Sequence, residues 1–293
     1  MRGFTLVELI ISITLVGILA VVAVPMLRMP MTAYMDAAHR ADLTGELDAG
    51  VGKLRDDFAK ALPNSIRTTQ LGARWFIEYL EVRAWGRYRA LPAIPAGPQS
   101  CPNPADTDVL QLTLNETCFI TFGPLQGSAP VVGTDWVVVN PLASTGAVAN
   151  PYFGGVATPA GGIKSRLQGL VPALLPGSSR ITMSPHQMPA GAPSRQFYIV
   201  STPVSYECDP ATRRLTRYSG YAITAAQPTA FAVANSAPLA TLVGACSIRY
   251  QATGAPGRGG IVSVWLRFTM NTAGTGVPES IDSFSEFSVR EPT

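Results

Sequence analysis

The chain has 293 residues, a formal net charge of only +3, and 14% charged residues. This low charge density and the lack of a basic tract argue against nucleic-acid binding, so no nucleic-acid partner is expected. About 230 residues follow the N-terminal helical segments, enough for one sizeable core or for two lobes that share an interrupted sheet, and we favour one domain.

A short basic leader and a long apolar segment make up the first 28 residues. The leader, 1–3, ends in Gly3, and the apolar segment contains one carboxylate, Glu8. The 19 residues from Leu9 to Leu27 carry no formal charge, and as a helix they would span roughly 28 Å, close to the hydrocarbon thickness of a bilayer. In an ordinary secretory signal the small residue follows the apolar core. Here Gly3 precedes it, which predicts a retained anchor.

The stretch from Gly3 to Pro25 resembles the class III signal of type IV prepilins and type II secretion pseudopilins, in which a leader ending in Gly precedes FTLVEL. The resemblance implies cleavage between Gly3 and Phe4, N-methylation of Phe4, and a role for Glu8 in assembly. It also implies that the helix bends near Pro25 and can unwind between Gly17 and Pro25 in a filament. The implied partners are prepilin peptidase, other major and minor pilin subunits, and an inner-membrane assembly platform.

The chemistry of Glu8 supports the same interpretation. A carboxylate within an apolar helix costs about 2.5–3.5 kcal/mol at the centre of the membrane, so it is normally paired or functional. Removal of the leader also removes Arg2, the cation nearest to Glu8 in the sequence. A methylated amine at Phe4 stays cationic, so the N-terminus of a neighbouring subunit could offset Glu8. The alternative is a plain signal anchor with Glu8 at the membrane interface.

A second helical pattern follows, so that the segments 4–28 and 29–63 form an assembly helix and its amphipathic continuation. Pro63 and Asn64 should stop it. Asp56 and Asp57 are expected on a solvated polar face. The apolar stripe should pack on a globular domain, with contact to a filament partner as the alternative. It consists of Leu43, Leu47, Val51, Leu54, Phe58 and Leu62.

Short β-type runs separated by Gly, Pro, Ser and Asn fill the region 64–293. The fold class is therefore α+β, with the long helix packed on a mainly antiparallel β domain with long loops. Asp209-Pro210 is typical of a hairpin turn. The Pro- and Gly-rich region 89–200 should form long irregular loops over a modest sheet. The candidate strands are 73–85, 109–122, 135–140, 194–208, 214–223, 245–252, 259–270 and 279–290.

Alternation within 259–270 separates two faces of one strand. Val262, Val264, Leu266, Phe268 and Met270 lie on one face, which we predict to be core.

All four cysteines, Cys101, Cys118, Cys208 and Cys246, lie in the β-rich region. Export would place them in an oxidising compartment, where an even count predicts two disulfides. Three pairings are possible. We prefer Cys101–Cys118 and Cys208–Cys246 because each closes one excursion between predicted strands. Metal binding is the alternative, but no CxxC spacing supports it.

No catalytic motif is visible. The two histidines, His39 and His186, lie outside any HExxH pattern and are expected at the surface, and no GxSxG or phosphate-loop signature occurs. The Gly-rich 254–260 is expected to be a turn. The sequence thus predicts a non-enzyme without cofactor or metal.

Later segments refine the resemblance. They look like MshO-type minor pilins of the mannose-sensitive haemagglutinin (MSHA) pilus, and the hairpin at 204–221 also looks like that of PilW-type pilins and J-type pseudopilins. This implies a minor pilin that initiates, assembles or caps a pilus near its tip. The segments that carry the MshO-type resemblance are 30–67, 135–141, 150–155 and 246–268.

The implied location is a single-pass inner-membrane protein with a periplasmic domain, later carried to the pilus and cell surface. One alternative is a pseudopilin of a type II secretion system. Another is a tip adhesin that binds a surface ligand through loops in 89–200, with Tyr152 and Phe153 as candidate contacts. The alternative for these two aromatic residues is that they belong to the core.

Overall fold

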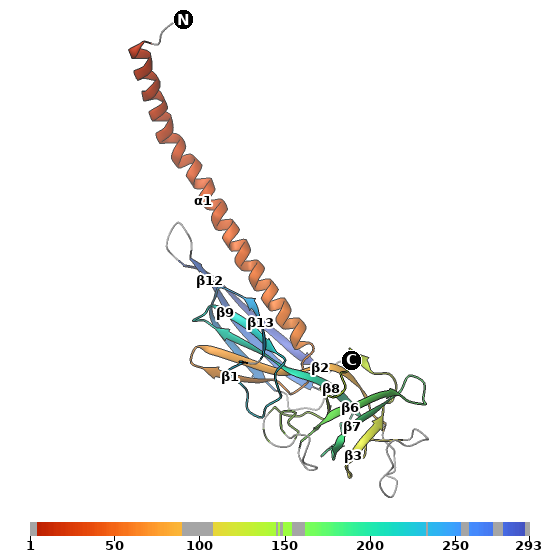
Figure 1. Cartoon of the computed structure of the whole chain (residues 1–293). Helices are drawn as coiled ribbons and strands as arrows, with labels where there is room; N and C mark the ends of the chain where they lie inside the picture. Colours follow the sequence, from red (N-terminus) through yellow and green to blue (C-terminus); the bar gives the residue numbers. More distant parts are fainter. Residues whose placement is uncertain are drawn as a thin grey trace.

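The protein consists of one long helix and a β domain (Figure 1). The computed structural model describes residues 5–89, 108–144, 146, 149–153, 162–232, 234–252, 258–271 and 278–290. The helix, α1, spans Leu6–Phe58. Its N-terminal part projects away from the β domain, and its C-terminal part lies along it.

The two predicted helical segments form this one element. Its backbone is helical through Pro25 and Pro30, and it ends at Phe58, before the predicted stop at Pro63. The reason is that the next residues already pair with a strand. The Leu62 amide donates to the Leu80 carbonyl at 2.8 Å, and the Val82 amide donates to the Lys60 carbonyl at 2.8 Å.

The described residues contain the following strands: β1 (Arg67–Leu71), β2 (Arg74–Arg87), β3 (Glu116–Ile120), β4 (Gln126–Gly127), β5 (Trp136–Val139), β6 (Lys164–Pro172), β7 (Ser179–His186), β8 (Gln196–Asp209), β9 (Arg214–Ser219), β10 (Asn235–Ala240), β11 (Val243–Gln251), β12 (Arg258–Asn271) and β13 (Pro278–Arg290). All of their pairings are antiparallel.

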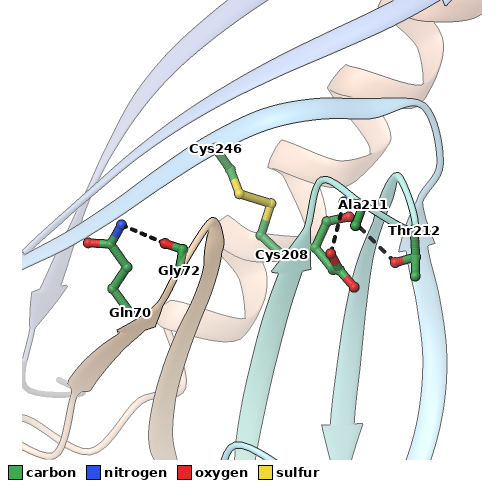
Figure 2. Close-up of a disulfide and its surroundings, with 7 residues drawn as sticks. Gln70, Gly72, Cys208, Ala211, Thr212 and Cys246 are labelled. Atoms are coloured by element: carbon green, nitrogen blue, oxygen red, sulfur yellow. Dashed lines mark hydrogen bonds between the residues drawn. A yellow bond between two sulfur atoms is a disulfide. The ribbon is translucent and has the colours of Figure 1, made fainter.

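In the described part of the chain the strands form two sheets. The ten-stranded sheet has the order β1-β2-β8-β5-β6-β7-β3, with β4 on β2 and the pair β9-β10 joined through β8. The three-stranded sheet has the order β11-β12-β13. A disulfide between Cys208 on β8 and Cys246 on β11 joins the two sheets, with a Cα–Cα distance of 6.6 Å (Figure 2).

The long strands β2 and β8 run through two packed regions. Their first paired stretch contributes Ile77, Tyr79, Val204 and Tyr206 to a core that also contains residues of α1 and of the three-stranded sheet. Beyond a register shift near Val82, the same strands enter a second core with β3, β5, β6 and β7. Figure 1 places β3, β6 and β7 at the end of the molecule away from the N-terminus.

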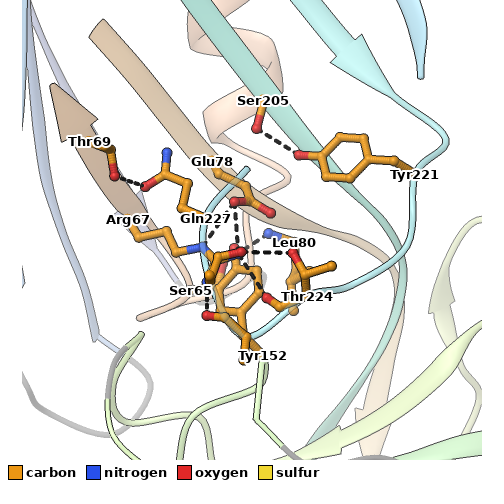
Figure 3. Close-up of polar contacts among 12 residues, drawn as sticks. Ser65, Arg67, Thr69, Glu78, Leu80, Tyr152, Ser205, Tyr221, Thr224 and Gln227 are labelled. Atoms are coloured by element: carbon orange, nitrogen blue, oxygen red, sulfur yellow. Dashed lines mark hydrogen bonds and ion pairs between the residues drawn. The ribbon is translucent and has the colours of Figure 1, made fainter. Parts of the chain in front are cut away.

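A buried ion pair lies on the opposite face of β2, beside a third packed cluster that contains Leu80 and Tyr152. Arg67 and Glu78 face each other across β1 and β2, and Arg67 Nε donates to Glu78 Oε2 at 2.9 Å (Figure 3). The same guanidinium donates to the Ala225 carbonyl at 2.6 Å and lies 3.7 Å from the centre of the Tyr152 ring. Arg67 therefore connects two distant chain segments, one at Ala225 and one at Tyr152, to the sheet.

The predicted fold class is confirmed. Each predicted strand run overlaps an observed strand, and the Asp209-Pro210 turn joins β8 to β9. The predicted inner face of β12 is also confirmed, since Val262, Val264, Leu266 and Phe268 are buried and Met270 packs against them.

The description of 89–200 as loops over a modest sheet is wrong for the segment 164–186. This segment forms β6 and β7 within the ten-stranded sheet. Local periodicity did not predict these strands, because Gly169, Pro172 and Pro185 interrupt the alternation of apolar residues. Strands β1, β4 and β10 were also not predicted.

Candidate functional site: the N-terminal helix and its junction with the β domain

A capping box starts the helix at Thr5. The Glu8 amide donates to Thr5 Oγ1 at 3.4 Å, and the Thr5 amide donates to Glu8 Oε2 at 3.5 Å. This arrangement holds the Glu8 carboxylate at the first turn, where the helix dipole favours a negative charge. Glu8 is exposed. Its carboxylate is therefore held in place locally and is still open to an external cation.

An apolar span follows directly. The segment Leu6–Ala23 has a mean hydropathy of 2.7 over 18 residues, and none of it is buried within the protein. Its few hydroxyl groups are satisfied internally: Ser12 Oγ donates to the Glu8 carbonyl at 2.7 Å, and Thr14 Oγ1 donates to the Ile10 carbonyl at 3.0 Å. By length and composition the span suits a bilayer, where unsatisfied polar groups are costly.

Gly17 lies in the middle of this span. A Cβ atom added there would meet nothing within 4 Å, so contacts within the chain do not require a glycine. Glycine lowers helix stability by about 1 kcal/mol relative to alanine. Gly17 is thus a weak point of the helix that packing within this chain does not explain, and unwinding between Gly17 and Pro25 stays a prediction.

Apolar packing fixes the other end of the helix. Leu43, Leu54 and Phe58 are at most 2% exposed. The Phe58 ring packs against Tyr79, Tyr206 and Phe287, with ring centroids 5.5–6.2 Å apart. The predicted apolar stripe is therefore core, as expected, although Leu62 belongs to a neighbouring cluster beyond the end of the helix.

Asp57 forms a polar clasp beside Phe58. It is 1% exposed, so the prediction of a solvated Asp57 is wrong. Its Oδ2 accepts hydrogen bonds from Tyr206 Oη at 2.5 Å and from Arg217 Nε at 2.7 Å, and its Oδ1 accepts one from Lys53 Nζ at 2.7 Å. Burial by itself would raise the pKa of Asp57, but these hydrogen bonds hold the pKa below its usual value. The buried carboxylate is therefore ionised and fully paired.

Two further polar contacts secure the helix towards its middle. The Glu46 carboxylate accepts hydrogen bonds from the amide of Thr241 at 2.9 Å and from its hydroxyl at 2.8 Å. Arg40 Nε pairs with Glu279 Oε1 at 2.5 Å. The helix is thus attached to the β domain from Arg40 to Phe58, while the apolar span has no such attachment.

The structure accounts for most of the other residues singled out in the sequence. Gly3, Phe4 and Cys101 lie outside the described residues. Cys118 is disulfide-bonded, and Cys208–Cys246 is the pairing preferred from the sequence.

Burial differs between the two histidines and between the two aromatic residues considered as ligand contacts. His186 is 3% exposed, and its Nε2 lies 2.8 Å from the Gly162 carbonyl, so the surface prediction is wrong for it. His39 is half-buried. Tyr152 is also buried, at 2% exposed, whereas Phe153 is 39% exposed. Burial leaves Phe153 as the more accessible of the two proposed ligand contacts.

Local sequence patterns did not predict the contacts that hold the helix in place. The spacing Thr5-x-x-Glu8 is a capping-box signal that could have identified Thr5. No comparable local signal connects Asp57 to Tyr206 and Arg217, because those residues come from a hairpin about 150 residues further along the chain.

Comparison with known proteins agrees with the geometry of the N-terminus. Residues 1–24 match the prokaryotic N-terminal methylation motif, the prepilin signal of type IV pilin-like proteins. With the apolar helix, this motif fits a single-pass inner-membrane anchor. It supports a type IV pilin-like or pseudopilin protein that interacts with prepilin peptidase and other pilins, and it suggests a structural rather than an enzymatic role. No curated protein and no solved structure matches the chain.

Proposed function

We propose that this protein is a minor type IV pilin of the MSHA type that helps to initiate, assemble or cap a pilus at or near its tip. The observation that carries the proposal is the division of α1. A methylation motif and an exposed apolar span occupy its first part, and its last part is clasped to a large β domain. Such a subunit can leave the membrane with its domain held rigidly on the helix.

Assembly would use Glu8 and the processed N-terminus. In this proposal prepilin peptidase cuts between Gly3 and Phe4, and the new amine of Phe4 is methylated and stays cationic. An exposed Glu8 can then pair with the amine of a neighbouring subunit, in surroundings where an unpaired carboxylate is costly. The pairing would set the axial position of one subunit on the next.

The size of the β domain favours a minor subunit. It contains both described sheets, lies along the C-terminal part of α1 and extends beyond the end of that helix (Figure 1). A domain of this size would crowd a shaft in which every subunit carried it, which fits a low copy number near the tip. The domain would be periplasmic before assembly and surface-exposed afterwards.

Two alternatives have specific support. A pseudopilin of a type II secretion system would carry the same N-terminal motif. A tip adhesin would need accessible side chains on the loops farthest from the membrane, and Phe122 and Leu174 are both 74% exposed there.

Filaments sheared from wild-type cells test the proposal directly. Mass spectrometry would quantify this chain against the major subunit and read its N-terminal peptide in the same run. A trace amount that begins with methylated Phe4 is the expected result. Processed protein that stays in the inner membrane and is absent from filaments would reject the minor-pilin proposal in favour of a secretion pseudopilin or a platform component.

Loss of surface binding in a strain from which this gene is deleted, with filaments still intact, would instead identify an adhesin. The deletion strain complemented with the wild-type gene is the matched control for that measurement.

A further inference from the structure

A basic pocket lies where β2 ends, in the region of β3, β6 and β7. Its volume is about 280 Å³. The pocket contains three arginines and, among the described residues that line it, no carboxylate. The lining residues are Arg87, Tyr88, Arg89, Phe122, Ser194 and Arg195.

Two of these arginines are available to a ligand. Arg87 and Arg195 are exposed, and neither takes part in the ion pairs found among the described residues. Arg195 also has a φ of 57°, a left-handed conformation that side-chain-bearing residues seldom adopt. Two backbone hydrogen bonds of 2.9 Å hold it there, one to the Ala192 carbonyl and one from the Tyr88 amide. Hydrogen bonds thus hold the backbone of Arg195 in a conformation that is rare for residues with side chains, at a position that lines the pocket.

An exposed aromatic ring borders the same pocket. Phe122 is 74% exposed, yet its backbone is held firmly: its amide donates to the Arg87 carbonyl at 2.7 Å. The preceding Thr121 donates through Oγ1 to the Gly123 carbonyl at 2.7 Å and accepts a hydrogen bond from the Ser179 amide at 2.8 Å. Phe122 therefore offers an exposed apolar ring on a fixed backbone beside the arginines.

An uncharged groove adjoins the basic pocket. It has a volume of about 610 Å³ and runs between the segment 124–130 and the turn that joins β6 to β7. Phe122 borders the pocket and Pro124 borders the groove, so residues no more than about 7 Å apart along the chain contribute to both. The groove is lined by Pro, Leu, Ala, Gly, Ser and Gln residues, and Leu174 at its turn is 74% exposed.

The place of these features in the fold keeps them away from the bilayer that would hold the apolar span. The apolar span lies at the opposite end of the molecule (Figure 1). A helix of 53 residues is about 80 Å long, so a membrane that holds its N-terminus is far from this groove.

We propose that the pocket and groove together bind an extended peptide segment of another protein, in which an acidic group lies next to apolar residues. The arginines bind the carboxylate, since guanidinium groups match carboxylates in charge and geometry. The apolar side chains of the peptide pack on Phe122 and in the groove.

Charge and polarity distinguish this ligand from other macromolecules. A nucleic acid would need cations spaced along its backbone, but the groove is uncharged. An acidic oligosaccharide would need hydrogen-bond partners for many hydroxyl groups, and the walls of the groove are largely apolar. The inference goes beyond the proposed pilus function and does not depend on it.

A displayed library of random peptides, selected on the full-length chain in detergent micelles, tests the proposal. We expect enriched peptides to carry Asp or Glu beside Leu, Val, Pro or aromatic residues. Fluorescence anisotropy with a synthetic enriched peptide should show at least tenfold weaker binding when its acidic residues are replaced by Asn or Gln. No enrichment, or enrichment without acidic residues, would overturn the proposal.

Matched variants locate the site. Binding of the enriched peptide should weaken at least tenfold in the double variant R87E/R195E and also in Phe122→Ala, while Arg214→Glu, which reverses an exposed charge on β9, should bind as wild type. Circular dichroism checks that each variant is folded. Equal binding by R87E/R195E and wild type, or preferential binding of oligogalacturonate over the peptide, would reject the peptide site without affecting the tests of processing and filament incorporation.

Discussion

At the scale of single residues, two carboxylates on α1 have opposite environments. Glu8 is exposed and is held by a capping box at the start of the helix. Asp57 is buried, and three side chains donate hydrogen bonds to it near the end of the helix. The first carboxylate is available for a partner, whereas the second holds the helix to its own domain.

Replacement of Glu8 by alanine should separate processing from assembly. We expect Glu8→Ala to be cleaved normally, because the cleavage position precedes Phe4, but to enter filaments at a small fraction of the wild-type level. The reason is the loss of the carboxylate that offsets a neighbouring amine. Immunoblots of sheared filaments and membranes measure both steps. The control is Asp48→Ala, an exposed position of α1 outside the apolar span. Normal incorporation of Glu8→Ala would contradict charge pairing.

Replacement of Asp57 should destabilise the whole chain. We expect Asp57→Ala to lower the free energy of unfolding by about 3 kcal/mol, because it leaves the half-buried Arg217 and the buried hydroxyl of Tyr206 without their acceptor. Asp56 is exposed, and Asp56→Ala should change the free energy by no more than about 0.5 kcal/mol. Urea denaturation of the full chain in detergent compares the two neighbours. Similar effects at both positions would show that Asp57 is not the clasp described above.

At the scale of elements, the disulfide and the helix stabilise the same core. Cys208 and Cys246 join β8 to β11, and the residues around them pack with Leu54 and Phe58 of α1. The three-stranded sheet is thus attached to the larger sheet by a covalent bond and to the helix by apolar contacts. Its docking should be sensitive to loss of that bond.

Removal of the Cys208–Cys246 bond has a calculable effect. The cysteines are separated by 38 positions, so loop closure contributes about 4 kcal/mol in the chain-entropy model. The double variant C208S/C246S should therefore lose about that much unfolding free energy. Thermal unfolding of both proteins under non-reducing conditions checks it. A midpoint equal to that of the wild type would show that the bond constrains little in the unfolded chain.

At the scale of the whole molecule, buried carboxyl groups make stability depend on pH. Burial raises the pKa of Glu116 to about 7, and Asp108 contributes in the same direction. The folded state therefore binds more protons than the unfolded state between about pH 4.5 and 7. Burial also raises the pKa of Glu78 to about 7, although Arg67 opposes the shift.

The unfolding free energy should consequently fall as the pH is raised from about 4.5 to 7 and then level off. Glu116→Gln cannot ionise, so its profile should be flatter across that interval. Denaturant titrations at several pH values supply the measurement. A Glu116→Gln profile as steep as that of the wild type would mean that Glu116 ionises normally in the folded state. Below about pH 4 the effect of Asp57 has the opposite sign, because its lowered pKa costs stability as the pH falls.

How much of the molecule could be predicted depended on the range of the interactions. The α+β class, the apolar span, the buried stripe of α1, the inner face of β12 and the β8–β9 turn all follow from local periodicity or turn chemistry. Strands β6 and β7 did not, because their glycine and prolines hide the alternation. The prediction for His186 was wrong because a lone polar residue in a loop-like sequence gives no sign that a carbonyl will accept a hydrogen bond from it.

The sequence by itself determined the N-terminal signal and the helix that carries it, because hydropathy, the position of one glycine and the spacing of one carboxylate are properties of neighbouring residues. Only the tertiary structure decided that Asp57 is a buried clasp and that Arg67 fastens distant segments. It also decided that arginines from two separate segments face one pocket. Each of these depends on residues that strand pairing brings together from far apart in the chain, and such pairings are set by the packing of the whole core.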